Sequence, residues 1–243
     1  MVVNSNAWNL ERGYDLTFRA PKDETPVVVE YDVPSFAHVI LFASETKCKC
    51  KYILPSISDT FYPVFAKDIT PQSLVGLLSE NTNLLIALSS KQTPLSSLAA
   101  EFSLVLPPPG TPLISYFPER KDPPSVVPVS VPSENPILTP NLPPVWFSGV
   151  PHSLGNNPLL VPILRAPAES FASEVDGSTA DALMDASGRG GEGLWAGSSL
   201  GLVTGFQTLN GARVTWVGGV DVFGDEYAQK EISKYVPTLN KFS

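Results

Sequence analysis

The 243-residue chain has little of several features that define common functional classes. Two cysteines exclude a disulfide-stapled mini-protein and a four-ligand zinc module. Its 16 basic residues face 24 acidic ones, and this net charge of −8 argues against a nucleic-acid partner. No apolar run reaches the roughly 18 residues of a membrane span, and no basic segment with an apolar core begins the chain. As given, the chain is expected to be soluble and to carry no targeting signal.

Proline is abundant and unevenly placed. The chain has 25 prolines, and 13 of them lie between Pro107 and Pro144. Because each proline removes an amide donor and favours an extended predecessor, this stretch cannot be a helix. Apolar pairs such as Leu113-Ile114 and Val126-Val127 are more than a spacer needs. We therefore predict that residues 107–150 form a packed irregular segment with short edge strands.

Strand and helix signals alternate before this stretch. Apolar runs at residues 38–43, 84–88 and 102–106 are typical of strands buried on both faces. Thr70 and Thr93 each precede a proline and leucines spaced on one face, which indicates two helix starts. This order predicts an α/β fold, with a parallel sheet and right-handed crossovers that place helices against it.

The C-terminal part contains a loop, a hairpin and a helix signal. Residues 169–193 combine Gly, Ser and six acidic residues, which predicts a mobile loop. Two β-rich runs, 200–206 and 213–220, flank Asn210-Gly211 and predict a hairpin. Asp225 can cap a final helix that reaches about Tyr235. We interpret residues 1–243 as one domain with an α/β part (10–106), the proline-rich segment and a C-terminal part (151–243).

Two motifs suggest chemistry that their contexts do not favour. Residues 188–193 satisfy the spacing G-x-G-x-x-G, but no strand precedes them and the surroundings are acidic, so a flexible loop is favoured over a dinucleotide site. Cys48 and Cys50 have the spacing of neither a redox nor a metal motif, although adjacent lysines would lower the pKa of their thiols. We predict no cofactor and no metal.

A catalytic triad is not apparent. The chain has two histidines, of which His38 opens an apolar run and His152 lies between a proline and a serine. Ser89 follows a predicted strand but lacks the flanking glycines of a nucleophile turn. A hydrolase of unfamiliar design, which would depend on His152 or Ser89, is the last of three functional hypotheses.

Acidic residues gather where a doubly wound sheet places its ligand crevice. Asp221, Asp225 and Glu226 follow the last predicted strand and could hold a cation or a sugar hydroxyl there. A structural role is favoured, because Asp225 can cap a helix and Asp221 can bind turn amides.

Five sets of segments, which cover most of residues 12–235, share an order and spacing with a known family. They are Arg12–Arg19, Val39–Ala43, Trp146–Val150 with Asn157–Leu160, Leu200–Gln207, and Asn210–Asp225 with its hairpin and S-x-D-x-F-like end. Together they resemble the beta subunit of eukaryotic oligosaccharyltransferase, of the Wbp or 48-kDa type, in which the first set reads R-G-[FY]-[DE]-[LV]-T-F-K.

The resemblance implies a non-catalytic scaffold subunit in the lumen of the endoplasmic reticulum. The complex moves an oligosaccharide from dolichyl diphosphate to Asn in Asn-x-Ser/Thr. The implied fold is glutamine-amidotransferase-like or flavodoxin-like, with helices on both faces of a parallel sheet. The implied partners are the catalytic, ribophorin-type and DAD-type subunits. The full-length family member is expected to be a single-pass type I membrane protein.

The chain departs from the family at three places. Compared with the family pattern, we expect no signal peptide and no first strand before Arg12 and no anchor after the final helix, and we interpret residues 47–67 as an insertion. Trp146, Phe147 and Tyr116 are candidate partner anchors, with burial in the core as the alternative. A binding module for a glycan or the lipid-linked diphosphate is the second functional hypothesis, on the strength of Asp221 and Asp225.

Overall fold

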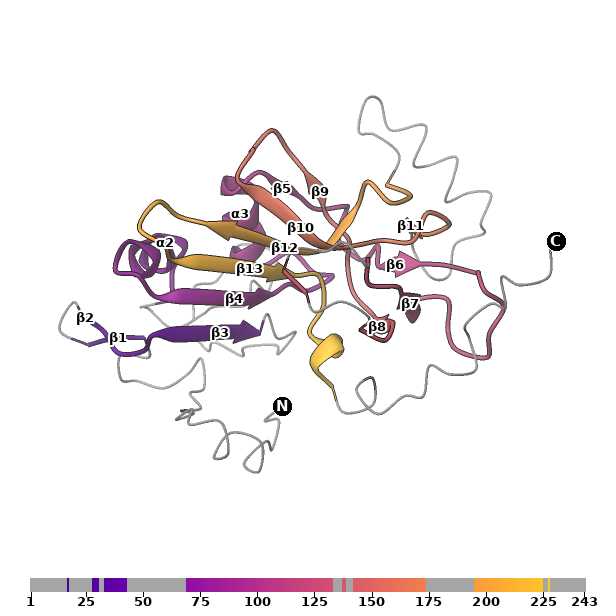
Figure 1. Ribbon diagram of the computed structural model, residues 1–243, viewed down its shortest axis with the longest axis horizontal. Helices are drawn as coiled ribbons and strands as arrows, with labels where there is room; N and C mark the ends of the chain where they lie inside the picture. Colours follow the sequence, from indigo (N-terminus) through magenta and orange to yellow (C-terminus); the bar gives the residue numbers. More distant parts are fainter. Residues whose placement is uncertain are drawn as a thin grey trace, which may run out of the picture.

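A five-stranded sheet with two helices on one face organises the protein (Figure 1). The computed structural model describes residues 17, 28–30, 33–42, 69–132, 137–138, 142–173, 195–224 and 227. The strands of this sheet, in spatial order, are β10 (Leu160–Arg165), β12 (Gly201–Gln207), β13 (Arg213–Val217), β4 (Asn83–Ala87) and β3 (His38–Phe42).

The sheet is mixed, which corrects the prediction of a parallel sheet. Strands β3, β4 and β13 run parallel to one another, whereas β12 and β10 continue the sheet antiparallel. The predicted hairpin accounts for this, because the turn at Asn210-Gly211 joins β12 to β13 as neighbours. The prediction of an α/β fold is confirmed at this coarser level.

The helix α2 (Pro71–Ser79) begins where the sequence predicts. Thr70 Oγ1 accepts a hydrogen bond from the Ser73 amide at 3.1 Å, and Ser73 Oγ accepts one from the Thr70 amide at 2.8 Å. This capping box satisfies two amides that a helix start leaves without a partner. The hairpin secures the other end, where Asn210 Nδ2 donates to the carbonyls of Leu78 and Ser79 at 2.9 Å each.

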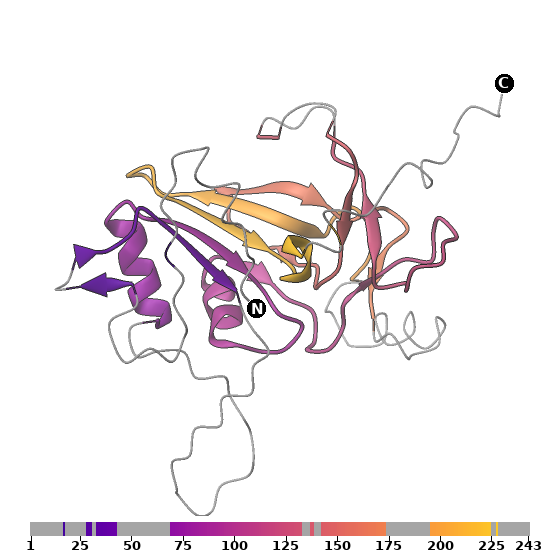
Figure 2. The same cartoon turned by 90° about the horizontal axis from the view of Figure 1, so that it is seen from below.

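The second helix, α3 (Pro94–Glu101), packs beside α2 on the same face of the sheet (Figure 2). Trp216 of β13 and Ile86 of β4 point into the layer between sheet and helices and are fully buried. One core cluster therefore combines both helices with this face. The leucines that the helices contribute are Leu74, Leu77, Leu78, Leu95 and Leu98.

The strand β3 is partly exposed to solvent, which corrects one prediction. Ile40 of β3 is 54% exposed, so the apolar run that begins at His38 forms an edge strand and is not buried on both faces. The two α-helices of the described residues lie on one face of the sheet, and the predicted final helix lies outside the described residues. The continuous apolar run thus predicted the position of the strand but not how much of it is exposed to solvent.

The run 102–106 was also misassigned. It contains β5 (Leu104–Val105), which leaves the sheet and pairs antiparallel with β9 (Ser153–Leu154). The chain turns away after α3 at Ser103, whose φ of 67° ends the helical path. This exit carries the chain into the proline-rich segment at the carboxyl end of the sheet.

The described residues of the proline-rich segment include buried strands. The segment contributes β6 (Leu113–Ile114), β7 (Val127–Val129) and β8 (Val145–Phe147), and β6 pairs with β11 (Phe171–Ala172). A second core cluster, called cluster 2, joins this segment to β10 and β12. Its buried members are Leu113, Val127, Val129, Phe147, Leu164, Ala166, Leu200 and Leu202.

The remaining elements are short. They are the hairpin of β1 (Val29–Glu30) and β2 (Val33–Pro34) and the 3-10 turn η1 (Asp221–Phe223). The predicted loop 169–193 begins with β11, and its residues 174–193 lie outside the described residues. The Cys48 and Cys50 pair and the final helix, apart from Tyr227, also lie outside them. No described helix has both the length and the apolar character that crossing a bilayer requires.

Candidate functional site

Two of the motif segments meet at the carboxyl end of β4 and β13. The Val150 amide donates a hydrogen bond to the Gly218 carbonyl at 2.7 Å, and Ser148 Oγ donates to Asp221 Oδ2 at 3.3 Å. The segment 146–150 is thereby held against the segment 218–221, although about 70 residues separate them in the sequence. The sequence motifs that carry the family resemblance therefore form one contact in space.

Glycines make this contact possible. A Cβ atom on Gly218 would lie 2.0 Å from the Val150 carbonyl oxygen, and one on Gly219 would lie 2.0 Å from the Ser148 carbonyl oxygen. Such distances are far below van der Waals contact, so any side chain here would separate the two backbones. The close contact between the two segments therefore requires glycine at both positions.

A small cavity of about 270 Å³ opens beside this contact. It is lined by Leu88, Ser89, Ser90, Pro112, Ser148, Gly149 and residues 218–221. Among the described residues, Asp221 is the only ionisable one that lines it. Of the three predicted acidic residues, Asp221 lies at the cavity, whereas Asp225 and Glu226 lie outside the described residues. A carboxylate without a basic neighbour in the lining disfavours a diphosphate at this cavity and is compatible with a hydroxyl-bearing ligand.

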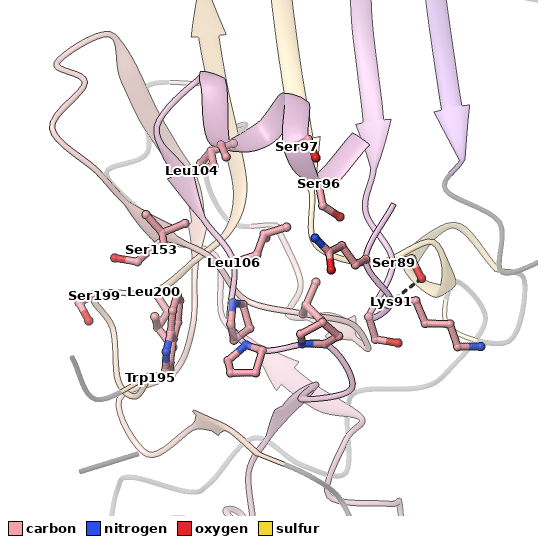
Figure 3. A pocket seen from close by; sticks show the side chains of 18 residues that line it. Ser89, Lys91, Ser96, Ser97, Leu104, Leu106, Ser153, Trp195, Ser199 and Leu200 are labelled. Carbon is pink, nitrogen blue, oxygen red and sulfur yellow. Dashed lines mark hydrogen bonds between the residues drawn. The ribbon is translucent and has the colours of Figure 1, made fainter. Parts of the chain in front are cut away.

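A larger cavity of about 820 Å³ shares Ser89 and Ser90 with the first (Figure 3). Its lining comes from the end of β4, the start of α3, β5 and the loop around Trp195. Sequence analysis did not identify it. The signal that was available is the repeated Ser-Ser pair, 89–90 and 96–97, placed at a strand end and in the first turn of a helix.

The predicted partner anchors divide into two groups. Trp146 and Phe147 are 1% and 0% exposed, so the structure places them in the core, the alternative that the sequence left open. Tyr116 is 41% exposed and Phe117 next to it is 66% exposed. Of the three predicted anchors, Tyr116 is therefore the one that lies at the surface, and Phe117 lies exposed next to it.

One arginine holds this aromatic pair in place. The Arg120 guanidinium donates hydrogen bonds to five carbonyl oxygens at distances from 2.6 to 3.3 Å. The acceptors are Ser115, Phe117, Pro118, Pro124 and Val126. Sequence analysis did not identify Arg120, because a single arginine in a proline-rich segment has no pattern that marks it.

The two residues of the hydrolase hypothesis do not act together. His152 is fully buried, and its Nε2 atom forms a 2.6 Å hydrogen bond with Thr204 Oγ1. Burial lowers the pKa of His152 from 6.5 to about 4, so the ring is neutral at physiological pH. Ser89 Oγ accepts a hydrogen bond from the Lys91 amide instead. No group of three or more His, Cys, Asp or Glu side chains among the described residues is placed to hold a metal ion.

Together, fold and site define a mixed α/β domain whose proline-rich segment is locked onto the carboxyl end of the sheet. The chain belongs to the OST48 N-terminal domain family, whose model matches residues 9–242.

Two curated relatives are subunits of dolichyl-diphosphooligosaccharide–protein glycosyltransferase. The subunit wbp1 of Schizosaccharomyces pombe is 26% identical over 238 residues, which cover 95% of this chain and 48% of the relative. The 48 kDa subunit of Danio rerio is 24% identical over 233 residues, which cover 92% and 47%. The chain thus spans about half the length of these relatives.

Among solved structures, the mmIFT52 N-terminal domain superposes with a TM-score of 0.48 and 13% identity. The superposition covers 68% of this chain and 66% of that structure.

Proposed function

We propose that this chain is part of a non-catalytic accessory subunit of the oligosaccharyltransferase complex, which transfers an oligosaccharide from dolichyl diphosphate to Asn in Asn-x-Ser/Thr. The observation that carries the proposal is the family match along residues 9–242, together with relatives that are named as subunits of that glycosyltransferase. This chain would present a binding surface to partner subunits in the endoplasmic reticulum lumen. The full-length protein would be anchored as a single-pass type I membrane protein.

The state of the two histidines supports a non-catalytic role. His152 is buried and bound to Thr204, so it cannot touch a substrate. His38 lies on the edge strand β3, where its Nδ1 atom is 3.2 Å from Asn83 Nδ2. Neither contacts a serine or cysteine nucleophile in the described part of the chain, and a fold alone does not confer an activity.

The exposed aromatic pair Tyr116-Phe117 is the surface that we propose for partner subunits. Aromatic side chains on a rigid loop lose little conformational entropy on binding, and Arg120 supplies the rigidity here. The proposed partners are the catalytic, ribophorin-type and DAD-type subunits. The loop would insert into an apolar recess on one of them.

We also propose that residues 1–243 form one domain with a glutamine-amidotransferase-like origin. Cluster 2 joins the proline-rich segment to β10 and β12, as expected if residues 1–243 form one domain. The parallel strands β3, β4 and β13, with a cavity at their carboxyl end, are the features that a glutamine-amidotransferase-like origin would leave.

The test uses the full-length protein with an affinity tag, expressed in cells. We expect the catalytic subunit to co-purify with it, and we expect the double substitution Tyr116→Ala and Phe117→Ser to reduce that recovery and the glycosylation of a reporter. The matched control is Leu209→Ser, which alters a fully exposed apolar side chain on the hairpin. A wild-type protein that recovers no oligosaccharyltransferase subunit would refute the proposed function.

Glycan binding is the second candidate function. The oxygen atoms of Ser148 and Asp221 line the small cavity, and Asp221 disfavours a diphosphate there. A neutral sugar hydroxyl fits this chemistry better than the charged part of a lipid-linked oligosaccharide does. Asp221→Asn should leave glycan affinity nearly unchanged and should remove any discrimination against anionic ligands. Both effects can be measured by titration with neutral and phosphorylated sugars.

A further inference from the structure

The larger cavity has the size of a ligand site. Its volume of about 820 Å³ lies within the range of small-molecule sites, roughly 300–1,000 Å³. It lies at the carboxyl end of β4, where open α/β sheets bind ligands. Figure 3 shows labelled side chains from three directions around it, with Ser96 and Ser97 on one wall and Ser153, Ser199 and Trp195 on the facing wall.

Uncharged hydrogen-bonding groups line two opposite walls. The seven residues that provide them are Ser89, Ser90, Gln92, Ser96, Ser97, Ser153 and Ser199. The hydroxyl groups of Ser97 and Ser153, which come from opposite walls, form no hydrogen bond to another described residue. A hydroxyl can donate one hydrogen bond and accept two, so these walls suit a ligand that carries many hydroxyl groups of its own.

The floor between these walls is apolar. Leu106, which follows β5, lies between them, and the half-buried indole of Trp195 stands beside Leu200 at one side. Leu104 and Pro107–Pro109 add further apolar lining. A pyranose ring is also two-sided, with C–H groups on its faces and hydroxyls at its edge. An aromatic or apolar platform below such a ring, with hydroxyls around it, complements both parts.

The charge of the lining narrows the ligand class further. None of the described residues that line this cavity is Asp or Glu, although the chain has 24 acidic residues. Lys91 is the one charged lining residue, and its ammonium group points away from the cavity in Figure 3. A charged ligand would therefore lose its hydration without gaining a partner of opposite charge.

We infer that the 820 Å³ cavity binds a short, uncharged saccharide, with the β5 segment below the sugar ring, the indole of Trp195 at its side and the serine hydroxyls around its edge. The inference extends the proposed glycan binding from the small cavity to the larger one beside it, with which it shares Ser89 and Ser90, and it rests on that proposed function for the biological source of the saccharide. The chemistry that it assigns to the cavity rests on the lining alone.

The test is binding of the purified full-length protein to an array of neutral and uronic-acid-containing oligosaccharides, followed by titration with mannotriose and with trigalacturonate. We expect saturable binding of neutral oligosaccharides and at least tenfold weaker binding of the uronate. Trp195→Ala should weaken binding about tenfold or more, and Ser97→Ala with Ser153→Ala should weaken it about tenfold. Ser130→Ala, at an exposed serine outside the cavity, is the control.

Each outcome decides the question. Absence of binding to every neutral oligosaccharide, or binding that the Trp195 and serine variants do not change, would overturn the inference. Binding of an apolar peptide that tolerates the serine substitutions would assign the cavity to a protein partner. Sugar binding by a protein that recovers no oligosaccharyltransferase subunit would leave this inference standing while the proposed function failed.

Discussion

The two core regions of the molecule satisfy their backbone polar groups in different ways. The sheet-and-helix region contains the core cluster that lies between both helices and the sheet. Here the backbone amides donate hydrogen bonds to neighbouring strands or, at a helix start, to a capping side chain. In the proline-rich region, residues 107–150, many residues have no amide to donate. There a side chain from the same segment supplies the missing donors.

Arg120 shows what this difference means. Its planar guanidinium is always charged and carries five N–H donors, and it reaches five carbonyl oxygens within residues 115–126. Regular structure distributes backbone pairing over many residues, so the loss of one contact is tolerated. In the proline-rich region, the pairs β6–β11 and β7–β8 are short, and one side chain provides the hydrogen bonds to five carbonyl oxygens within residues 115–126. We therefore expect this part of the region to depend more on a single residue.

The largest predicted effect tests whether the proline-rich region has a core of its own. Phe147→Ala removes a fully buried ring from cluster 2 and should lower the free energy of unfolding by about 3–5 kcal/mol, measured by urea denaturation. The control Phe117→Ala removes a ring that is 66% exposed and should cost well under about 1 kcal/mol. Equal effects of the two substitutions would show that the region is not packed as described.

Sequence patterns predicted one region better than the other, for physical reasons. Both helix starts and the hairpin carry local signals, namely Thr-Pro caps and Asn-Gly, and these elements are confirmed. Local patterns cannot show which strands become neighbours, so β5 was placed in the wrong sheet and β3 was predicted to be buried. The sheet order depends on contacts between segments more than 100 residues apart, such as β4 with β13.

The candidate site was predictable only in part. The position of Asp221 at a strand end predicted its place at a cavity, because carboxyl ends of parallel strands meet at one edge. Trp195 and Ser153 line the larger cavity from segments that show no pattern around them. The role of Arg120 depends on five carbonyl oxygens that the folded loop brings around its guanidinium group, and the spacing of residues in the sequence does not show this arrangement.

His152 lies beside the junction of the two regions and should make stability depend on pH. It is buried next to Thr204 and forms a bridge with Gly201 at the start of β12. The folded state holds its pKa at about 4, whereas the unfolded chain has the ordinary value of 6.5. The unfolded state therefore binds more protons between these values, and stability should fall as the pH is lowered from about 6.5 to about 4.

The size of this pH effect is about 3 kcal/mol in total, and it should level off below pH 4. His152→Gln, which can still bond to Thr204, should remove this component from the pH profile of urea unfolding. The substitution can also change stability at neutral pH, so the slope and not the midpoint is the readout. An unchanged slope in His152→Gln, or its loss in His38→Gln instead, would contradict the assignment.

Arg120→Met tests the concentration of backbone pairing directly. Methionine keeps much of the length and apolar stem but donates no hydrogen bond, so five carbonyls lose a charged partner. We expect a loss of about 2 kcal/mol and faster amide hydrogen exchange within residues 111–129. The control Arg165→Met removes an exposed arginine that donates to the Ser198 carbonyl and should cost less than about 0.5 kcal/mol. Similar costs for the two arginines would mean that the proline-rich region does not depend on Arg120.

The smallest predicted effect is the loss of unfolding free energy when one backbone hydrogen bond is removed from the sheet-and-helix region. Thr70→Ala removes one acceptor from the α2 capping box and should cost about 1 kcal/mol in urea unfolding, because a single helix amide loses its partner. Thr93 precedes α3 in the same way, but there the main contact runs from its amide to Ser96 Oγ at 3.1 Å, so Thr93→Ala should cost less. A Thr70 effect as large as that of Arg120 would erase the contrast between distributed and concentrated backbone pairing.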